Sequence, residues 1–222
     1  MLTILTDMEV RVLGCLVEKQ VTTPEYYPLT LNALTLACNQ KNNRQPVTSL
    51  NETAVLEAVE SLREKNLVYI FYGSNSRVPK YKHVMPEILH LSQPKLALMC
   101  VLMLRGPQTV GELRERASRL YEFAGLEEAE DTLSSLITKD GDNEPLVARL
   151  PRQPGQKEAR FAHLLGGDLD LEALAELEVS QHSTSRQSAT ERISQLEHQI
   201  EALSGEMKSL REEFAAFKKQ FE

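Results

Sequence analysis

The sequence lacks the signatures of the common catalytic and cofactor-binding sites. Its 222 residues contain no P-loop, no GxSxG elbow, no HExxH zinc motif and no CxxC pair. The five histidines do not have the spacing of metal ligands: His83, His90, His163, His182 and His198. These absences favour a non-enzymatic protein without a metal or cofactor. An enzyme with an unrecognised site is a third class that stays open.

Cysteines and long apolar runs are also scarce. Cys15, Cys38 and Cys100 are widely spaced within apolar helical patterns, which predicts core packing in a reducing compartment rather than a disulfide framework. The longest apolar run, residues 96–104, is about half of what a bilayer crossing needs. The N-terminus has neither a basic n-region nor a small-residue cleavage site. We therefore expect a soluble protein of the cytoplasm that does not insert into a membrane.

The negative charge is concentrated at the C-terminal end of the chain. The whole chain carries a formal net charge of −7, but residues 1–93 hold nine Lys/Arg against nine Asp/Glu and residues 94–165 hold ten against eleven. Residues 166–222 hold six against twelve. No part has the domain-wide positive excess of a strong non-specific DNA binder, although a neutral domain can carry a local basic face.

The pattern of residues 45–84 predicts a helix followed by a β-hairpin. Ser49 and Glu52 have the spacing of a capping box at the start of the helix. Residues 67–72 are β-branched and aromatic and predict a strand, and residues 78–84 predict the returning strand after a Gly-Ser-Asn-Ser turn. A helix that leads into a two-stranded ribbon is typical of the second half of a winged helix-turn-helix domain.

Two further helices are predicted before this unit. Thr6 and Glu9 form a capping-box pair for a helix that runs to about Lys19. Pro28 suits the first turn of a second helix, which ends near Asn39. Residues 1–93 thus predict one winged-helix domain.

Residues 94–165 repeat this order of elements. The apolar run 96–104 predicts a helix buried on several sides, and Thr109 with Glu112 begins another. A helix over 126–138 and two strands near 146–150 and 159–165 complete a second winged-helix domain. The pattern predicts three corresponding pairs of residues: Leu62 with Leu136, Tyr81 with Phe161, and His83 with His163.

The remaining chain predicts an acidic amphipathic piece and polar linker over 166–189 and a coiled-coil helix over 190–222. In the latter, apolar residues recur at alternating steps of three and four, with Ile at a and Leu at d, which favours a parallel homodimer. The alternative is a single helix that folds back on its own chain. The predicted fold class is therefore mainly α with small β-hairpins (α+β): two tandem winged helix-turn-helix domains followed by a C-terminal coiled-coil helix.

One loop and the first hairpin concentrate amide and cationic side chains. Amides and Arg can read base edges, and Lys and Arg can neutralise phosphates. The candidate residues for binding nucleic acid or a protein partner are Asn39, Gln40, Lys41, Asn43, Arg44, Arg77, Lys80, Lys82 and His83. The competing interpretation is a solvated loop, a strand edge protected by lysines, and histidines at positions 83 and 163 that act as structural polar caps.

The predicted third helices of both domains are poor readers of a DNA groove. Glu52, Glu57, Glu60 and Glu64 outnumber the cations of the first, and the second carries four carboxylates between residues 127 and 131 with no cation before Lys139. A winged helix with an acidic third helix favours protein docking instead.

Residues 9–46 resemble the signature region of the bacterial YceH family, whose members have no assigned biochemical function. The matching residues include Glu9, Arg11, Leu13, Gly14, Glu18, Lys19, Thr22, Thr23, Pro24, Tyr27, Pro28, Asn32, Ala33, Leu34, the run 37–41, Asn43, Arg44 and Pro46. Later matches are Arg77-Val78, Lys80-Tyr81-Lys82-His83, and the motifs at 105–109 and 111–114. The resemblance covers residues 6 to about 165. It implies tandem winged helices and implies no enzyme, ligand or partner.

Two functions follow from these features. The first is a cytoplasmic, non-enzymatic, DNA-binding or regulatory protein that uses the loop and hairpin to contact duplex DNA. The alternative is a protein-interaction scaffold whose winged-helix domains dock other proteins, as in chromosome-condensation complexes.

Overall fold

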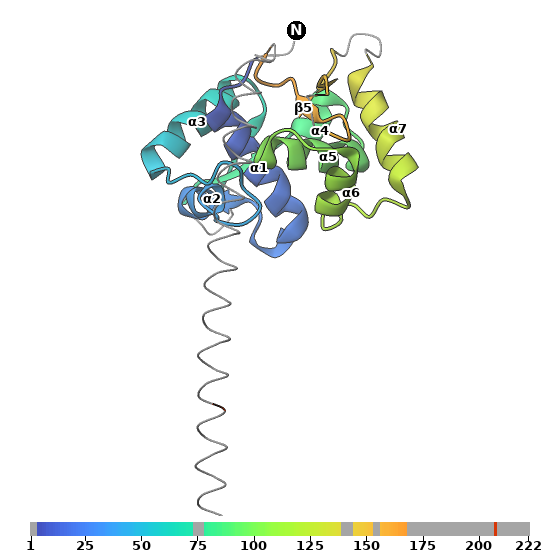
Figure 1. Cartoon of the computed structure of the whole chain (residues 1–222). Coiled ribbons are helices and arrows are strands. Elements are labelled where there is room, and N and C mark those ends of the chain that lie inside the picture. The colour runs from blue at the N-terminus through green and yellow to red at the C-terminus, as the bar shows by residue number, and fades with distance from the viewer. Residues whose placement is uncertain (1–3, 73–77, 139–143, 153–155, 168–206, 208–222) are drawn as a thin grey trace, which may run out of the picture. The chain divides into compact units, whose positions relative to one another are not determined.

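The structure, a computed structural model, describes residues 4–72, 78–138, 144–152, 156–167 and Met207. The chain divides into two compact units, Met1–Leu169 and Asp170–Glu222, and every element described below lies in the first. Helices and small antiparallel sheets make this unit α+β, which confirms the predicted class (Figure 1). The linker predicted over 166–189 and the coiled coil predicted over 190–222 fall almost wholly outside the described residues and stay predictions.

The first half of the unit has the order helix, strand, helix, helix, strand, strand. Its elements are α1 (Asp7–Thr22), the 3-10 turn η1 (Pro24–Tyr26), β1 (Leu29–Thr30), α2 (Leu31–Cys38), α3 (Glu52–Glu64), β2 (Val68–Phe71) and β3 (Lys80–His83). The strands form one antiparallel sheet in the order β1-β3-β2. The short helix α4 (Met85–Leu89), which the sequence pattern does not predict, leads into the second half.

The second half repeats this order with shorter strands. Its elements are α5 (Gln93–Arg105), α6 (Val110–Ala117), α7 (Leu126–Ile137), β4 (Val147–Arg149) and β5 (Phe161–His163). β4 and β5 pair antiparallel, and Gln108 forms a bridge to Phe161. This bridge corresponds to the pairing of Leu29 with Tyr81 in the first half.

Backbone hydrogen bonds confirm the residue correspondence between the halves. Val68 pairs with His83, and Val147 pairs with His163. In each half, the leucine just before the first hairpin strand donates its N–H to the carbonyl oxygen of the last buried leucine of the preceding helix. Leu67 donates to Leu62 O at 2.9 Å, and Leu146 donates to Leu136 O at 2.9 Å. The three predicted pairs of equivalent residues therefore occupy equivalent backbone positions.

Helix caps decide where several of these elements begin. Two of the three predicted capping boxes are present, Thr6 with Glu9 and Thr109 with Glu112. The predicted box of Ser49 with Glu52 is wrong, because Asn51 caps α3 by accepting the N–H of Ala54 at 2.8 Å. An Asn side chain is as effective a cap as Ser and lies directly before the first helical residue.

The predicted place of Pro28 in the first turn of the second helix is also wrong. Pro28 lies before β1, and α2 begins at Leu31 with Thr30 as its cap. The reason is tertiary, because Leu29 and Thr30 pair with β3 and are held in an extended conformation. In α7, Ala129, Leu133 and Leu136 are buried, whereas Leu126 is exposed.

α1 is enclosed by the other helices of the unit. Ten consecutive residues, from Glu9 to Glu18, are buried, because α1 packs against α5 on one side and against α2 and α3 on the other (Figure 1). Residues 1–93 and 94–165, predicted as two domains, thus lie in one compact unit and contribute to one hydrophobic core. Whether each half folds by itself stays a prediction.

Gly14 permits the close contact of α1 with α5. A Cβ at this position would lie 2.9 Å from Leu104 Cδ2 and 3.2 Å from Met103 Cβ. The thiol of Cys100, on the same face of α5, lies 3.6 Å from the carbonyl oxygen of Gly14. A methyl group at position 14 would therefore collide with side-chain atoms of α5.

We predict that Gly14→Ala lowers the free energy of unfolding by up to about 2 kcal/mol, because an overpacking cost of about 1–3 kcal/mol outweighs the roughly 1 kcal/mol gain in helix propensity. Gly111→Ala in α6 is the matched control, since nothing lies within 4 Å of its would-be Cβ. The control should be as stable as the parent or more so. Urea unfolding of both variants checks this, and a Gly14→Ala protein at least as stable as the parent would contradict the helix contact.

Candidate functional site

The donor-rich loop that follows α2 is built around a buried cation. Arg44 is only 5% exposed, and its guanidinium nitrogens lie 2.5 Å and 3.2 Å from the two carboxylate oxygens of Glu18 on α1. Its Nε donates to the carbonyl oxygen of Ala37 at 3.1 Å, and Nη2 donates to Gln40 Oε1 at 3.2 Å. Burial acts to lower the pKa of Arg44, but the hydrogen bond to Glu18 raises it above its ordinary value. Arg44 therefore stays charged and holds the loop against α1.

The amides of the loop are also occupied by internal hydrogen bonds. Asn39 accepts the N–H of Leu50 at 2.7 Å and donates to its carbonyl oxygen at 2.8 Å. Asn43 has a φ of +61°, a conformation that Asn tolerates better than most residues, and its Oδ1 accepts from Arg105. Of the loop residues predicted as contacts, Lys41 alone is exposed.

The loop therefore does not present the predicted edge of cations and amides. Arg44 forms an internal ion pair. Asn39, Gln40 and Asn43 form hydrogen bonds with the backbone or with neighbouring side chains. The prediction missed this because a polar, basic loop has the same sequence pattern whether its side chains point inward or outward.

The β2–β3 hairpin divides its predicted residues between two faces. Tyr81 and His83 are buried, whereas Lys80 is half-buried and Lys82 exposed, which confirms the two-residue period. Arg77 lies outside the described residues. His83 is thus removed from the candidate contact surface.

Aromatic side chains share the outer face of this hairpin with the lysines. Tyr69 lies opposite Lys82 and Phe71 opposite Lys80, and the two aromatics are 47% and 45% exposed. We call these four residues the hairpin face. Beyond it, Tyr72 and Val78 are 63% and 55% exposed. The alternation of the segment 68–71 could have revealed Tyr69 and Phe71, since they share one side of the strand.

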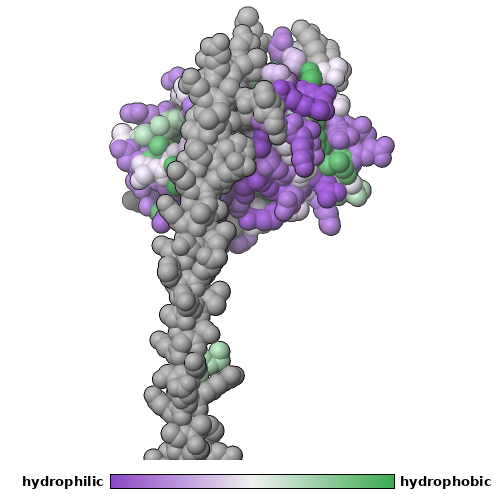
Figure 2. Space-filling view, in the orientation of Figure 1, coloured by the Kyte–Doolittle hydropathy of each residue, from purple (hydrophilic) through white to green (hydrophobic). Residues whose placement is uncertain are grey.

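Apolar residues elsewhere on the surface are scattered. The visible face of the described residues is mostly hydrophilic, with hydrophobic residues in small separate patches (Figure 2). Tyr26 and Leu36 are the largest exposed apolar side chains near α2 and do not belong to the hairpin face. Single exposed apolar residues of this kind are normal in soluble domains.

The exposed side of α3 is acidic. Glu52, Glu57 and Glu64 are exposed, and Glu60 forms an ion pair with Arg63. The equivalent helix α7 exposes Glu127, Glu130 and Asp131. If either helix entered a DNA groove, these carboxylates would face phosphates. This agrees with the sequence-based prediction that both helices are poor readers of a groove.

The cysteines of the described residues are buried in the core. Cys15, Cys38 and Cys100 are free and buried, which confirms core packing, and burial raises the pKa of Cys100. Among the described residues no cluster of His, Cys, Asp or Glu could hold a metal ion, and no helix is long and apolar enough to cross a membrane.

His83 and His163 occupy equivalent positions at the ends of β3 and β5, where His83 is buried and His163 is half-buried. His83 Nδ1 accepts the N–H of Met85 at 3.4 Å, while His83 Nε2 and His163 Nδ1 have no partner within the described part of the chain. Burial lowers the pKa of each imidazole to about 4.

Comparison with known proteins decides the family. A family described as "Protein of unknown function, DUF480" matches residues 5–156, more than half of the chain. The chain belongs to this family. A UPF0502 protein of Pelobacter propionicus is 49% identical over 220 residues, which cover 99% of each chain. UPF0502 proteins of Geotalea uraniireducens and Opitutus terrae are 50% and 52% identical, the first over 98% of both chains and the second over 77% of this chain and 73% of its own.

Membership of the DUF480 family confirms the expectation of a family without an assigned function. The YceH name stays a resemblance. The alignments with two of these relatives extend over nearly the whole chain and so include the C-terminal residues outside the described structure.

We predict that stability falls as the pH drops from about 6.5 to 4. In this window the unfolded chain protonates its histidines, while His83 and His163 stay neutral in the folded protein until the pH approaches about 4. The loss by pH 4 is up to roughly 3 kcal/mol for each histidine. Urea unfolding at several pH values measures it.

The variants His83→Gln and His163→Gln should each flatten this pH dependence, whatever their stability at pH 7. His90→Asn is the control, because His90 is exposed and Asn tolerates its positive φ of 49°. An unchanged slope in both Gln variants would show that the two imidazoles are protonated in the folded protein.

Proposed function

We propose that this chain is a non-enzymatic, tandem winged-helix protein that acts by binding another protein through its hairpin face. The partner presents apolar side chains flanked by carboxylates. DNA-binding, the first of the two functions expected from the sequence, is the less supported of the two.

Support for the winged-helix architecture comes from the order and pairing of the elements. The first half has the order helix, strand, helix, helix, strand, strand, with the first strand beside the last. The second half repeats the order with a single bridge, Gln108 to Phe161, in place of the first strand. In such a fold the third helix and the ribbon are the usual contact elements.

The observation that carries the proposal is the exposure of Tyr69 and Phe71 beside two lysines. Aromatic residues dominate the energetics of protein interfaces, because they bury a large area at a small cost in side-chain entropy. Lys80 and Lys82 lie directly across from them and would pair with carboxylates of a partner. The same face would gain little from DNA, since a duplex offers no apolar side chains to the aromatic rings.

The distribution of charge in the first half also argues against binding in a DNA groove. Residues 1–93 have no net charge, α3 exposes carboxylates, and the most basic residue of the loop is buried in an ion pair. Nucleic-acid binding depends on neutralising several phosphates, so few contacts predict weak and salt-sensitive affinity.

A cytoplasmic location and a homodimer form part of the proposal. Three reduced cysteines suit a reducing compartment. The heptad pattern of residues 190–222 supports a parallel two-stranded coiled coil. Such a dimer would carry two hairpin faces and gain avidity for a partner with repeated sites.

We predict that Tyr69→Ser with Phe71→Ser abolishes capture of the partner in the cells that produce the protein, because the apolar part of the interface is removed. The full-length chain is crosslinked in its native cells and purified with and without nuclease. Tyr26→Ser with Leu36→Ser is the matched control, since it removes two exposed apolar side chains elsewhere and should keep the partner.

Charge reversal tests the stated chemistry of the partner. Lys80→Glu with Lys82→Glu should weaken capture at least tenfold, with native circular dichroism retained. Capture that survives in the Tyr69/Phe71 double variant would overturn the proposal. Capture that disappears on nuclease treatment would also overturn it and would favour DNA-binding.

A further inference from the structure

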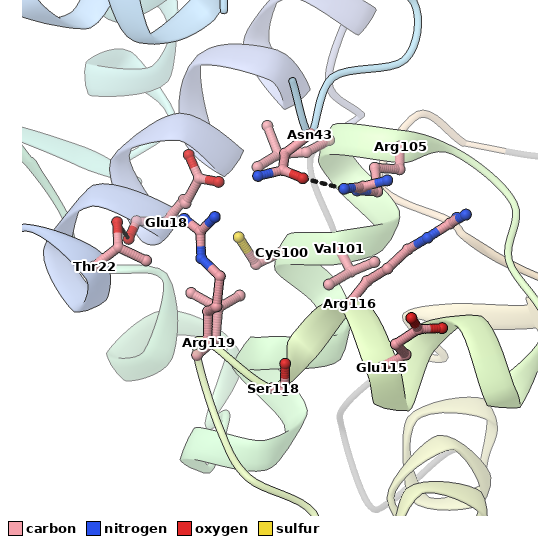
Figure 3. A pocket seen from close by; sticks show the side chains of 12 residues that line it. Glu18, Thr22, Asn43, Cys100, Val101, Arg105, Glu115, Arg116, Ser118 and Arg119 are labelled. Atoms are coloured by element: carbon pink, nitrogen blue, oxygen red, sulfur yellow. Dashed lines mark hydrogen bonds between the residues drawn. The ribbon is translucent and has the colours of Figure 1, made fainter. Parts of the chain in front are cut away.

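A small cavity lies between the two halves of the unit, away from the hairpin face. Its volume is about 210 Å³, and it is lined by α1, the loop at Asn43, α5, and α6 with the turn that follows (Figure 3). Cys100, Val101, Leu104 and Leu120 form an apolar wall. This volume is below the usual range for drug-sized ligands, so the cavity suits a small molecule.

Three arginines line this cavity. Arg105 is the last residue of α5, Arg116 lies in α6, and Arg119 follows α6. In Figure 3, Arg119 extends toward Glu18 and Arg105 toward Asn43, with Cys100 between them. The lining therefore brings cations from two helices to one hollow.

Carboxylates compensate only part of this positive charge. Arg105 donates to the neutral amide of Asn43, and Arg116 lies 3.4 Å from the half-exposed Glu112. Arg119 has no hydrogen bond or ion pair within the described ranges of the chain. Of the lining carboxylates, Glu115 is exposed, and Glu18 is already bound to Arg44.

The electrostatics of Arg105 agree with an excess of positive charge. Burial lowers the pKa of Arg105, and the like charges of Arg116, Arg44 and Arg119 lower it further, although Glu18 raises it. A bound anion would relieve this repulsion.

We propose that this cavity binds a small organic phosphate, with the phosphate held by Arg105, Arg116 and Arg119 and the organic part against the apolar wall. Guanidinium groups bind phosphate oxygens through paired N–H donors. Within the described part of the chain, Arg105 and Arg119 have no carboxylate partner, whereas Arg116 is paired with Glu112. The hydroxyls of Thr22 and Ser118 also line the cavity and can donate to a polar ligand. Because the ligand would contact both halves, its binding stabilises their association.

Calorimetric titration of the full chain tests this site with glycerol 3-phosphate, inorganic phosphate, succinate and glycerol as probes. We expect glycerol 3-phosphate to bind more tightly than inorganic phosphate, because only the ester has a body to contact the apolar wall. Succinate should bind at least tenfold more weakly than the ester, and neutral glycerol should not bind.

Two variants assign any binding to this cavity. Arg119→Gln should weaken it at least tenfold. Arg114→Gln, at an exposed residue of α6 that does not line the cavity, should change it less than twofold. Arg116→Gln provides a second loss-of-charge variant. Four results would each overturn the proposal: no binding of the ester at ~10 mM, a weak site by affinity arithmetic; equal affinity for succinate; inorganic phosphate binding as tightly as the ester; or unchanged binding in both pocket variants.

Discussion

The buried ion pair between Glu18 and Arg44 is the interaction on which the arrangement of the two halves depends. Arg44 brings the loop after α2 onto α1, and the neighbouring residues then reach α5: Asn43 accepts from Arg105, and Gln45 donates its N–H to Leu104 O at 2.8 Å. A charge at 5% exposure is stable only when it is paired, so the carboxylate of Glu18 must stay in place. The same loop therefore connects the sheet half to the helix that lines the cavity.

Two other charged residues of α1 also bind neighbouring segments of the chain. Glu9 binds Lys65 at the end of α3 at 2.6 Å, and Arg11 donates to the carbonyl oxygen of Pro46 at 2.6 Å. α1 thus binds Lys65 through Glu9 and the loop at Pro46 through Arg11, while Gly14 allows α5 to pack closely against its backbone. Of the loop residues that the sequence suggested for binding, all except Lys41 form contacts within this assembly. The surfaces that we propose for partners are the hairpin face and the cavity.

Local patterns were sufficient to predict much of this fold. Thr6 with Glu9 and Thr109 with Glu112 fix helix starts through neighbours three residues away, and the apolar run 96–104 identifies α5 because nothing in it can face water. The start of α2 was missed because Leu29 pairs with Tyr81, 52 residues later. Arg44 was misplaced for the same reason, since its partner Glu18 lies 26 residues earlier in the chain. The cavity could not be predicted, because Asn43, Arg105 and Arg119 meet only after both halves have packed.

The stability of a Glu18→Gln variant tests the role of this loop most directly. Removing the charge of one partner leaves Arg44 buried without a counter-ion, so the free energy of unfolding in urea should fall by about 3–5 kcal/mol. Glu60→Gln, which breaks the more exposed pair with Arg63, should change it by no more than about 1 kcal/mol. A Glu18→Gln protein as stable as the parent would contradict the account, because Arg44 would then be free to serve a partner rather than the fold.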